Sequence, residues 1–178
     1  MGEVENVEHH NHKGIGITLY VDHQKGSAST SDFSKEAIDE TLQKALDIAR
    51  YTHTDPYAGL ADKEFLAFGY PDLQLFHPWS LTPNEAIVLA QDCEAKGRAI
   101  DKKITNSEGA SVSSHQFIVT YGNTHGFIGS FPATRHAISL SLIAQEKDQM
   151  QRDHSYTVAR DPLDLLSINK VAEDAGLK

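Results

Sequence analysis

Apolar and polar residues alternate along the front of the chain with the period of a half-buried β-strand. The alternation is clearest from Ile15 to Val21, and a shorter run from Val4 to Val7 also favours a strand. The residues from His12 to Gly14 suit a hairpin turn between the two, and the small side chains from Lys25 to Thr30 favour a third strand. The front of the chain is therefore predicted to form an antiparallel meander.

A helical period follows this meander. Ser34 suits the N-cap of a helix, and apolar residues recur beyond it at helical spacing as far as Ala49, with charged residues between them. This helix is expected to end between Tyr51 and Thr54. From 55 to 81 the chain is polar, aromatic and interrupted by proline and glycine, so this segment is predicted to be a connector between two halves.

The strongest helix signal begins at Thr82. Its hydroxyl can accept a hydrogen bond from a free amide of the first turn, Pro83 needs no amide partner, and Glu85 can complete a capping box. The apolar face of this helix comprises Ala86, Ile87, Ala90, Cys93, Gly97 and Ile100. The pattern then predicts strands at 104–113, 116–121, 126–131, 134–144 and 151–159, and a further helix from Asp161 and Pro162.

Runs of strands grouped with helices, without a βαβ alternation, indicate an α+β fold with antiparallel sheets and packed helices. The predicted organisation has two α/β halves. Residues 1–54 form the meander and its helix, 55–81 the connector that contains proline and glycine, and 82–160 a helix with antiparallel strands. Residues 161–178 are predicted to start a helix that the end of the chain cuts short.

The composition indicates a soluble, acidic protein. Residues 1–80 carry 6 cationic and 13 acidic side chains, or −7, and the remainder carry 10 and 12, or −2, which gives the formal net charge of −9. Neither half has the stripe of lysine and arginine that nucleic-acid binding requires. No window holds the roughly 18 apolar residues of a membrane span, and the acidic start does not resemble a secretion signal. The single cysteine, Cys93, favours a cytoplasmic location.

Candidate catalytic and metal-binding side chains are few. Zinc peptidases often carry two histidines four residues apart on a helix with a glutamate base, and none of the ten histidines has this spacing. His10 and His12 would share one face of a strand and could bind a surface metal ion, although solvated histidines at a hairpin end explain the pattern better. Cys93 lies on an apolar helix face and is expected to be a small buried hydrophobic residue rather than a nucleophile.

Four polar residues are candidates for binding a ligand. Asn123 and His125 lie between two glycines, where a backbone bend could expose them; the alternative is a hairpin turn with a left-handed Asn123 and a solvated His125. Arg135 and Arg152 lie on predicted strands. Arg152 could take up a peptide terminus or pair with a carboxylate, and a structural ion pair is the simpler interpretation.

Six segments together resemble the PmbA branch of the TldD/PmbA peptidase family in their order and spacing. They are Gly2–Val7, Lys25–Ser34, Leu46–Tyr51, Lys103–Ser111, Tyr121–Gly126 and Met150–Asp153. The resemblance implies the front portion of a family member, working in a pair of a TldD-like and a PmbA-like subunit that encloses a cavity. In such a pair the TldD-like subunit would supply zinc and cleave unfolded or short peptides.

The leading hypothesis is therefore the N-terminal portion of a PmbA-like subunit, acting as a non-catalytic scaffold for a TldD-like partner. Zinc is expected only in that partner. Because the helix that usually precedes the first strand in this family is missing, self-association through an exposed sheet face is also expected. The alternative hypothesis is a stand-alone module in which Asn123, His125, Arg135 and Arg152 bind a peptide or another anion.

Overall fold

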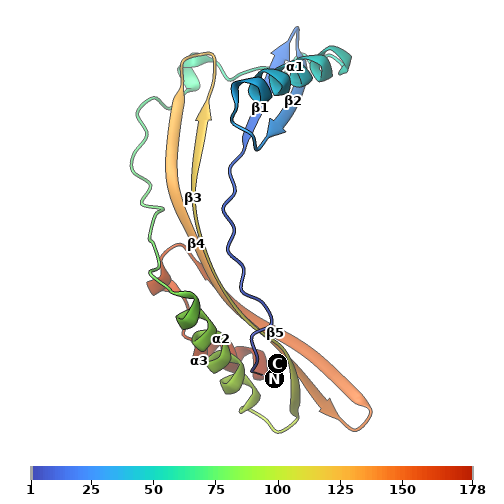
Figure 1. Ribbon diagram of the computed structural model, residues 1–178, viewed down its shortest axis with the longest axis vertical. Helices are drawn as coiled ribbons and strands as arrows, with labels where there is room; N and C mark the ends of the chain where they lie inside the picture. The colour runs from blue at the N-terminus through green and yellow to red at the C-terminus, as the bar shows by residue number, and fades with distance from the viewer. Residues whose placement is uncertain (1, 178) are drawn as a thin grey trace. The chain divides into compact units, whose positions relative to one another are not determined.

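Two separate units make up residues 2–177, the part of the chain that the computed structural model describes. We call them the hairpin unit, residues 8–68 and 123–127, and the sheet unit, residues 2–7, 69–122 and 128–177. Each contains antiparallel strands and at least one helix, which confirms the predicted α+β fold (Figure 1). Met1 and Lys178, the outermost residues of the predicted ranges, lie outside the described residues.

The hairpin unit is built on two antiparallel strands, β1 (Ile15–Val21) and β2 (Gln24–Thr30). Asp22 and His23 form the turn between them, with φ values of 49° and 63°. Positive φ at both positions is typical of the two-residue turn whose twist matches that of the flanking strands. The turn therefore fixes the register of this hairpin.

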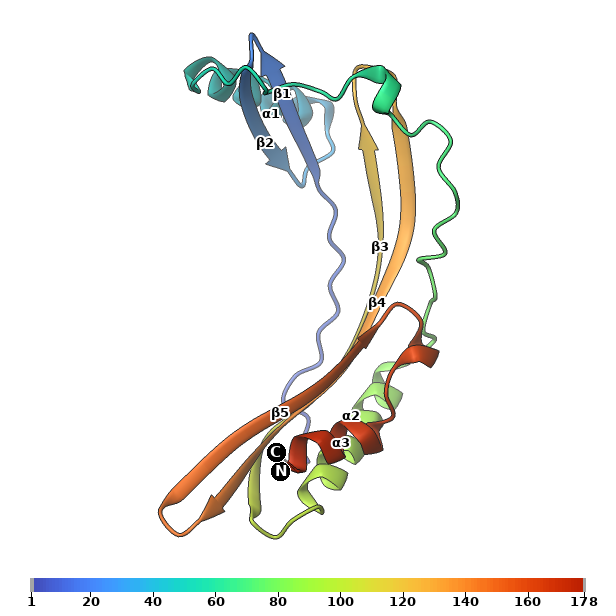
Figure 2. The same cartoon turned by 180° about the vertical axis from the view of Figure 1, so that it is seen from behind.

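Helix α1 (Lys35–Tyr51) packs against β1 and β2, as Figure 2 also shows from behind. It begins where the sequence predicts, because the Ser34 hydroxyl accepts a hydrogen bond from the amide of Ala37. Gly26 of β2 lets the helix approach closely, since a Cβ at this position would meet the backbone of Ala45 and Ala49. The contact is thus between backbones rather than between large side chains.

The predicted first strand of the meander, Val4 to Val7, is wrong. Residues 2–14 have no regular structure, and the side chains of Val4 and Val7 are exposed. The two valines lie three residues apart, so they cannot share one face of a strand with a period of two. The front of the chain therefore forms a two-stranded hairpin.

Three antiparallel strands form the sheet of the sheet unit, in the order β3-β4-β5. Strand β3 (Ile104–Gly122) pairs along its length with β4 (Ile128–Glu146), and β5 (Gln149–Ala159) pairs only with the part of β4 from His136 onward. The β3–β4 hairpin therefore continues well past the end of β5 (Figure 1).

The sequence predicts four strands where the structure has the two long ones. Ser114 and His115, placed in a break between strands, pair with His136 and Arg135 and continue the ladder. Pro132 also lies within β4, opposite Ile118. The prediction of breaks was wrong because polar residues and a proline near the middle of the hairpin resemble turn signals.

Two helices pack beside each other on one face of the sheet, α2 (Pro83–Arg98) and α3 (Ile168–Gly176) (Figure 2). The predicted capping box of α2 is confirmed, with Thr82 and Glu85 each accepting from the other's backbone amide. The predicted helix start at Asp161 is corrected: only a 3-10 turn, Pro162–Asp164, follows it, and α3 begins after Ser167.

The core of the sheet unit lies between this helix pair and the sheet. Its residues come from α2, α3 and alternate positions of the strands, and they are Cys93, Ile104, Ile138, Leu140, Leu142, Val171, Ala172 and Ala175. The expectation that Cys93 is a buried hydrophobic residue is confirmed. The connector predicted at 55–81 contains one short 3-10 turn, Lys63–Phe65, and no strand.

Candidate functional site

The turn that joins β3 to β4 holds the first two predicted site residues. The Asn123 side chain accepts hydrogen bonds from the amides of His125 (3.1 Å) and Phe127 (3.4 Å). Asn123 is not left-handed, because the positive φ of this turn falls on Gly126. His125 is not merely solvated either: its Nδ1 lies 3.0 Å from the carbonyl oxygen of Ala61, to which it donates. Both side chains therefore organise the hairpin unit, and their role toward a ligand stays a prediction.

Arg152 forms an ion pair within the sheet. Its Nε lies 2.8 Å from a carboxylate oxygen of Glu108 and 3.3 Å from the hydroxyl of Ser141, which itself donates to Glu108. The structural ion pair expected for Arg152 is confirmed, with Glu108 as the carboxylate. The Arg152 side chain is 61% exposed, so solvent weakens this interaction.

The other predicted cation, Arg135, lies elsewhere on the sheet. It is exposed on β4, opposite His115 of β3. Arg152 lies on β5, opposite Ile143 of β4 in the strand register. Eight residues of an extended strand separate Arg135 from Ile143, about 26 Å. The structure therefore does not bring the two arginines into one site.

A buried polar cluster that the sequence analysis missed lies at the middle of β4. His136 is fully buried, its Nε2 lies 2.9 Å from the carbonyl oxygen of His77, and its Nδ1 lies 3.0 Å from the hydroxyl of Ser114. Because a carbonyl only accepts, Nε2 carries the proton and Nδ1 accepts from Ser114 in the neutral ring. The His136 ring also packs edge-on against Trp79.

Thr134 is the second member of this cluster and is also fully buried. Its hydroxyl lies 2.8 Å from the carbonyl oxygen of Arg160 and accepts a hydrogen bond of 3.0 Å from the amide of His77. Its own amide donates to the carbonyl of Leu75. The alternation of buried residues along β4 was the signal that could have identified both positions.

Residues 70–77, which we call the strap, are held along β4 by these bonds. The strap also joins the end of β5, since Nδ1 of His77 lies 3.3 Å from a carboxylate oxygen of Asp161. The Nε2 atom of His77 lies 2.8 Å from the carbonyl oxygen of Gln74, and only a ring with a proton on each nitrogen donates to both of these acceptors. A groove of about 300 Å³ lies between the strap and β4, lined by Asp72, Leu73, Gln74, Leu75, Phe76, His77, Phe131 and Pro132.

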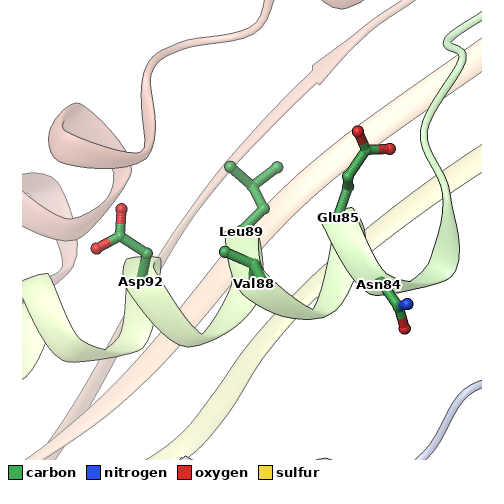
Figure 3. A pocket seen from close by; sticks show the side chains of 5 residues that line it. All are labelled: Asn84, Glu85, Val88, Leu89 and Asp92. Carbon is green, nitrogen blue, oxygen red and sulfur yellow. The ribbon is translucent and has the colours of Figure 1, made fainter.

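A second, shallow hollow of about 320 Å³ lies along α2, lined by Asn84, Glu85, Val88, Leu89 and Asp92 (Figure 3). Its two carboxylates have local partners. Glu85 belongs to the capping box, where hydrogen bonds from Thr82 hold the pKa of its carboxyl below the ordinary value. Asp92 pairs with Lys96 at 2.6 Å. The hollow is therefore an apolar helix surface between carboxylates that stabilise the helix itself.

The remaining candidates for chemistry are dispersed. Burial raises the pKa of the Cys93 thiol to about 11, which disfavours the nucleophilic thiolate. The rings of His10 and His12 stack at 5.4 Å, and His10 bonds to Glu8 at 2.8 Å. Within residues 2–177 no three histidine, cysteine or carboxylate side chains are grouped to hold a metal ion.

The most distinctive surface of the sheet unit is the end of the β3–β4 hairpin beyond β5. We call residues 115–122 of β3 and 128–135 of β4 the apolar hairpin end. Its exposed large apolar side chains lie on both faces of the hairpin, Ile118 and Ile128 on one face and Phe117, Val119, Tyr121 and Phe131 on the other. Exposed apolar patches of this kind mark contact sites for other macromolecules.

Comparison with known proteins places both parts of the chain in one group. Residues 76–178 match the family model described as the PmbA/TldA metallopeptidase central domain, and residues 1–49 match the one described as PmbA/TldA metallopeptidase domain 1. The chain is 50% identical over 173 residues to Metalloprotease PmbA of Escherichia coli O157:H7, covering 97% of this chain and 38% of that protein. It is 42% identical over 159 residues to the Metalloprotease PmbA homolog of Haemophilus influenzae, covering 89% and 35%.

Solved structures show the same fold. A Bacteroides thetaiotaomicron protein described as a modulator of DNA gyrase superimposes with a TM-score of 0.80 at 24% identity, covering 91% of this chain and 38% of that chain. TldE from Thermococcus kodakarensis superimposes with a TM-score of 0.63 at 15% identity, covering 99% and 39%. The chain thus spans less than half the length of the relatives it matches. None of the helices described here has the length and apolar character of a membrane span.

Proposed function

Since this chain belongs to the PmbA/TldD metallopeptidase family, we propose that it is the front portion of a PmbA-like subunit that serves peptide proteolysis as a non-catalytic scaffold. A TldD-like subunit is the proposed partner. That partner would supply zinc and cleave unfolded or short peptides in the cytoplasm. This chain would contribute a wall and a contact surface to the chamber.

The apolar hairpin end is the observation that carries this proposal. Ile118 and Ile128 are 72% and 76% exposed, and the neighbouring Phe117, Val119 and Phe131 are partly exposed on the same two strands. Leaving such side chains in water is unfavourable, by roughly 25 cal/mol for each Å² of apolar surface that a partner could cover. A surface of this kind favours macromolecular contact.

The polar side chains of the sheet unit support a structural role as well. Arg152 is paired with Glu108, and the buried His136 bonds to Ser114 and to the backbone of His77. These groups therefore hold strands and the strap in place. Such bonds supply the rigidity that a chamber wall needs.

The test is the zinc content after dialysis and the cleavage of an unfolded peptide, for this chain alone and mixed with a TldD-like subunit. We expect zinc and cleavage only in the mixture. An Ile128→Lys variant should weaken assembly with the partner, while Val88→Lys, on the exposed surface of α2, should not. Zinc or cleavage in the isolated chain would refute the scaffold role.

The alternative function is a stand-alone module for peptide or anion binding, and one observation favours it. Arg135 is exposed on β4, and no ion pair of this residue occurs within the described part of the chain. Calorimetric titration with short peptides in the absence of a partner tests this function. Binding that is lost in Arg135→Gln but kept in Arg152→Gln would favour it over the scaffold.

A further inference from the structure

We propose that the outer edge of β3 is a self-pairing surface, at which a second copy of this chain adds its own β3 in antiparallel orientation. Residues 116–122 of the two β3 strands would then pair, and the two β3–β4 hairpins would form one four-stranded sheet across a two-fold axis. This inference goes beyond the proposed function and does not depend on it. It also uses a surface different from the first-sheet face expected from the sequence.

Strand β3 is an edge strand over all 19 of its residues. It pairs with β4 on one side, and on the other side the structure shows no strand among residues 2–177. An edge strand offers a row of backbone amides and carbonyls to any chain that can lie beside it. Addition of a strand would satisfy those groups with main-chain hydrogen bonds.

The other edges of this sheet are protected. Beyond the end of β5, the strap covers β4: the amide of Thr134 donates to Leu75, and the amide of Ser130 donates to the hydroxyl of Tyr70. The outer strand β5 carries the charged residues Arg152 and Asp153, which discourage edge pairing. β3 has no such protection over its last 14 residues, which contain neither proline nor a lysine, arginine or carboxylate.

The charge distribution favours a second copy at this edge. The chain has a net charge of −9, so two copies repel each other over most of their surface. Residues 109–145, which contain most of β3 and β4, hold no aspartate or glutamate. Repulsion between exposed charges falls off over about 8 Å at physiological salt, so the approach of two copies is least opposed here.

The side chains of β3 are also complementary to themselves. In an antiparallel pair with its two-fold axis at Val119, Phe117 of one copy lies opposite Tyr121 of the other, and Ile118 lies opposite Thr120. Aromatic pairs and β-branched pairs are among the cross-strand neighbours that stabilise sheets most. Val119 would lie opposite its own copy. One short run of sequence thus supplies both halves of the contact.

Sedimentation velocity on the chain alone, over a range of protein concentrations, tests the pairing first. We expect a reversible dimer. Ile118→Lys places charges close to each other across the axis and should raise the dissociation constant about tenfold or more. Val88→Lys, which adds the same charge on α2, should leave it unchanged, and Trp79 fluorescence should show that both variants keep the folded sheet unit.

The position of the axis is tested by a single cysteine. Opposed residues of an antiparallel pair have Cα atoms about 4.5–5.5 Å apart, which suits a disulfide. Val119→Cys should therefore form a covalent dimer when oxidised glutathione is added, while the buried Cys93 does not react. Val88→Cys is the matched control and should not crosslink.

Three results would overturn the proposal. A monomer at all concentrations excludes self-pairing, and a dimer that neither crosslinks in the Val119→Cys variant nor responds to Ile118→Lys pairs through another surface. Slower amide exchange of residues 117–121 that appears only after mixing with a TldD-like subunit would assign the edge to that partner. None of these results depends on zinc or peptide cleavage, so they remain distinguishable from a failure of the scaffold role.

Discussion

Replacing Thr134 with valine should destabilise the sheet unit by about 2 kcal/mol. Valine has nearly the same shape, so the change removes one hydroxyl from a side chain that is fully buried and leaves packing intact. That hydroxyl accepts from the amide of His77 at 3.0 Å and donates to the carbonyl of Arg160 at 2.8 Å. The substitution therefore measures how much this hydroxyl contributes to holding the strap on β4.

The magnitude follows from the groups left behind. A buried donor or acceptor that loses its partner costs about 1–3 kcal/mol. The hydrogen bond from the His77 amide to the Thr134 hydroxyl is part-buried, whereas Arg160 is exposed, so its carbonyl oxygen can bind water instead. The cost of leaving the His77 amide without its partner, reduced slightly by the burial of the added methyl group, gives a loss of about 2 kcal/mol.

Urea denaturation monitored by the fluorescence of Trp79, the only tryptophan, is the assay. Trp79 lies two residues after the strap and packs against His136, so its signal reports on this region. Thr134→Ser keeps the hydroxyl and should retain most of the stability. Thr120→Val removes an exposed hydroxyl that bonds to Ser130 and is the matched control. A Thr134→Val variant as stable as Thr120→Val would refute the reasoning.

Three other predictions concern the helices. Gly26→Ala should separate α1 from β2 and speed amide exchange of α1 at least tenfold. Gly16→Ala is the control, because a Cβ at that position meets no atom within 4 Å, and equal exchange rates in the two variants would contradict the close backbone contact. Cys93 should resist a thiol reagent at mildly alkaline pH until the protein unfolds, because its thiol is buried and its pKa is about 11; rapid reaction of the folded protein would disprove this. Because the pKa of Glu85 is lowered, its cap stabilises α2 above the ordinary carboxyl pKa, and this stabilisation is lost as the pH falls through the lowered value. Acidification should therefore increase the opening of α2 measured by amide exchange in the unmodified chain, and much less in Glu85→Gln.

Local patterns explain which parts of the fold were predicted correctly from the sequence. Ser34 and the pair of Thr82 and Glu85 start their helices through bonds to amides no more than three residues away. The alternation from Ile15 to Val21 is likewise complete within one strand. Such features need no knowledge of the rest of the chain.

The missed features depend on contacts between distant residues. His77 bonds to Thr134 and to His136 across separations of 57 and 59 residues, and neither separation leaves a local motif. The ion pair of Arg152 was predicted but its partner was not, since Glu108 comes close to Arg152 only because β4 aligns β5 with β3. Ser114 and His115 have the polar character of a break between strands, and only their pairing with His136 and Arg135 on β4 places them within β3. The buried polar cluster therefore required the structure.

The hairpin unit is discontinuous in sequence, because residues 123–127 join residues 8–68. The family model for the central domain begins at residue 76 and so includes this turn, which in space belongs with the preceding domain. A polypeptide of residues 8–68 expressed alone would lack His125 and Phe127, and with them the bond to Ala61 and the ring contact with Phe68. A truncation at the domain boundary drawn from the sequence would thus divide a folded unit. A chimera that exchanges the first domain with that of a relative should therefore also exchange residues 123–127.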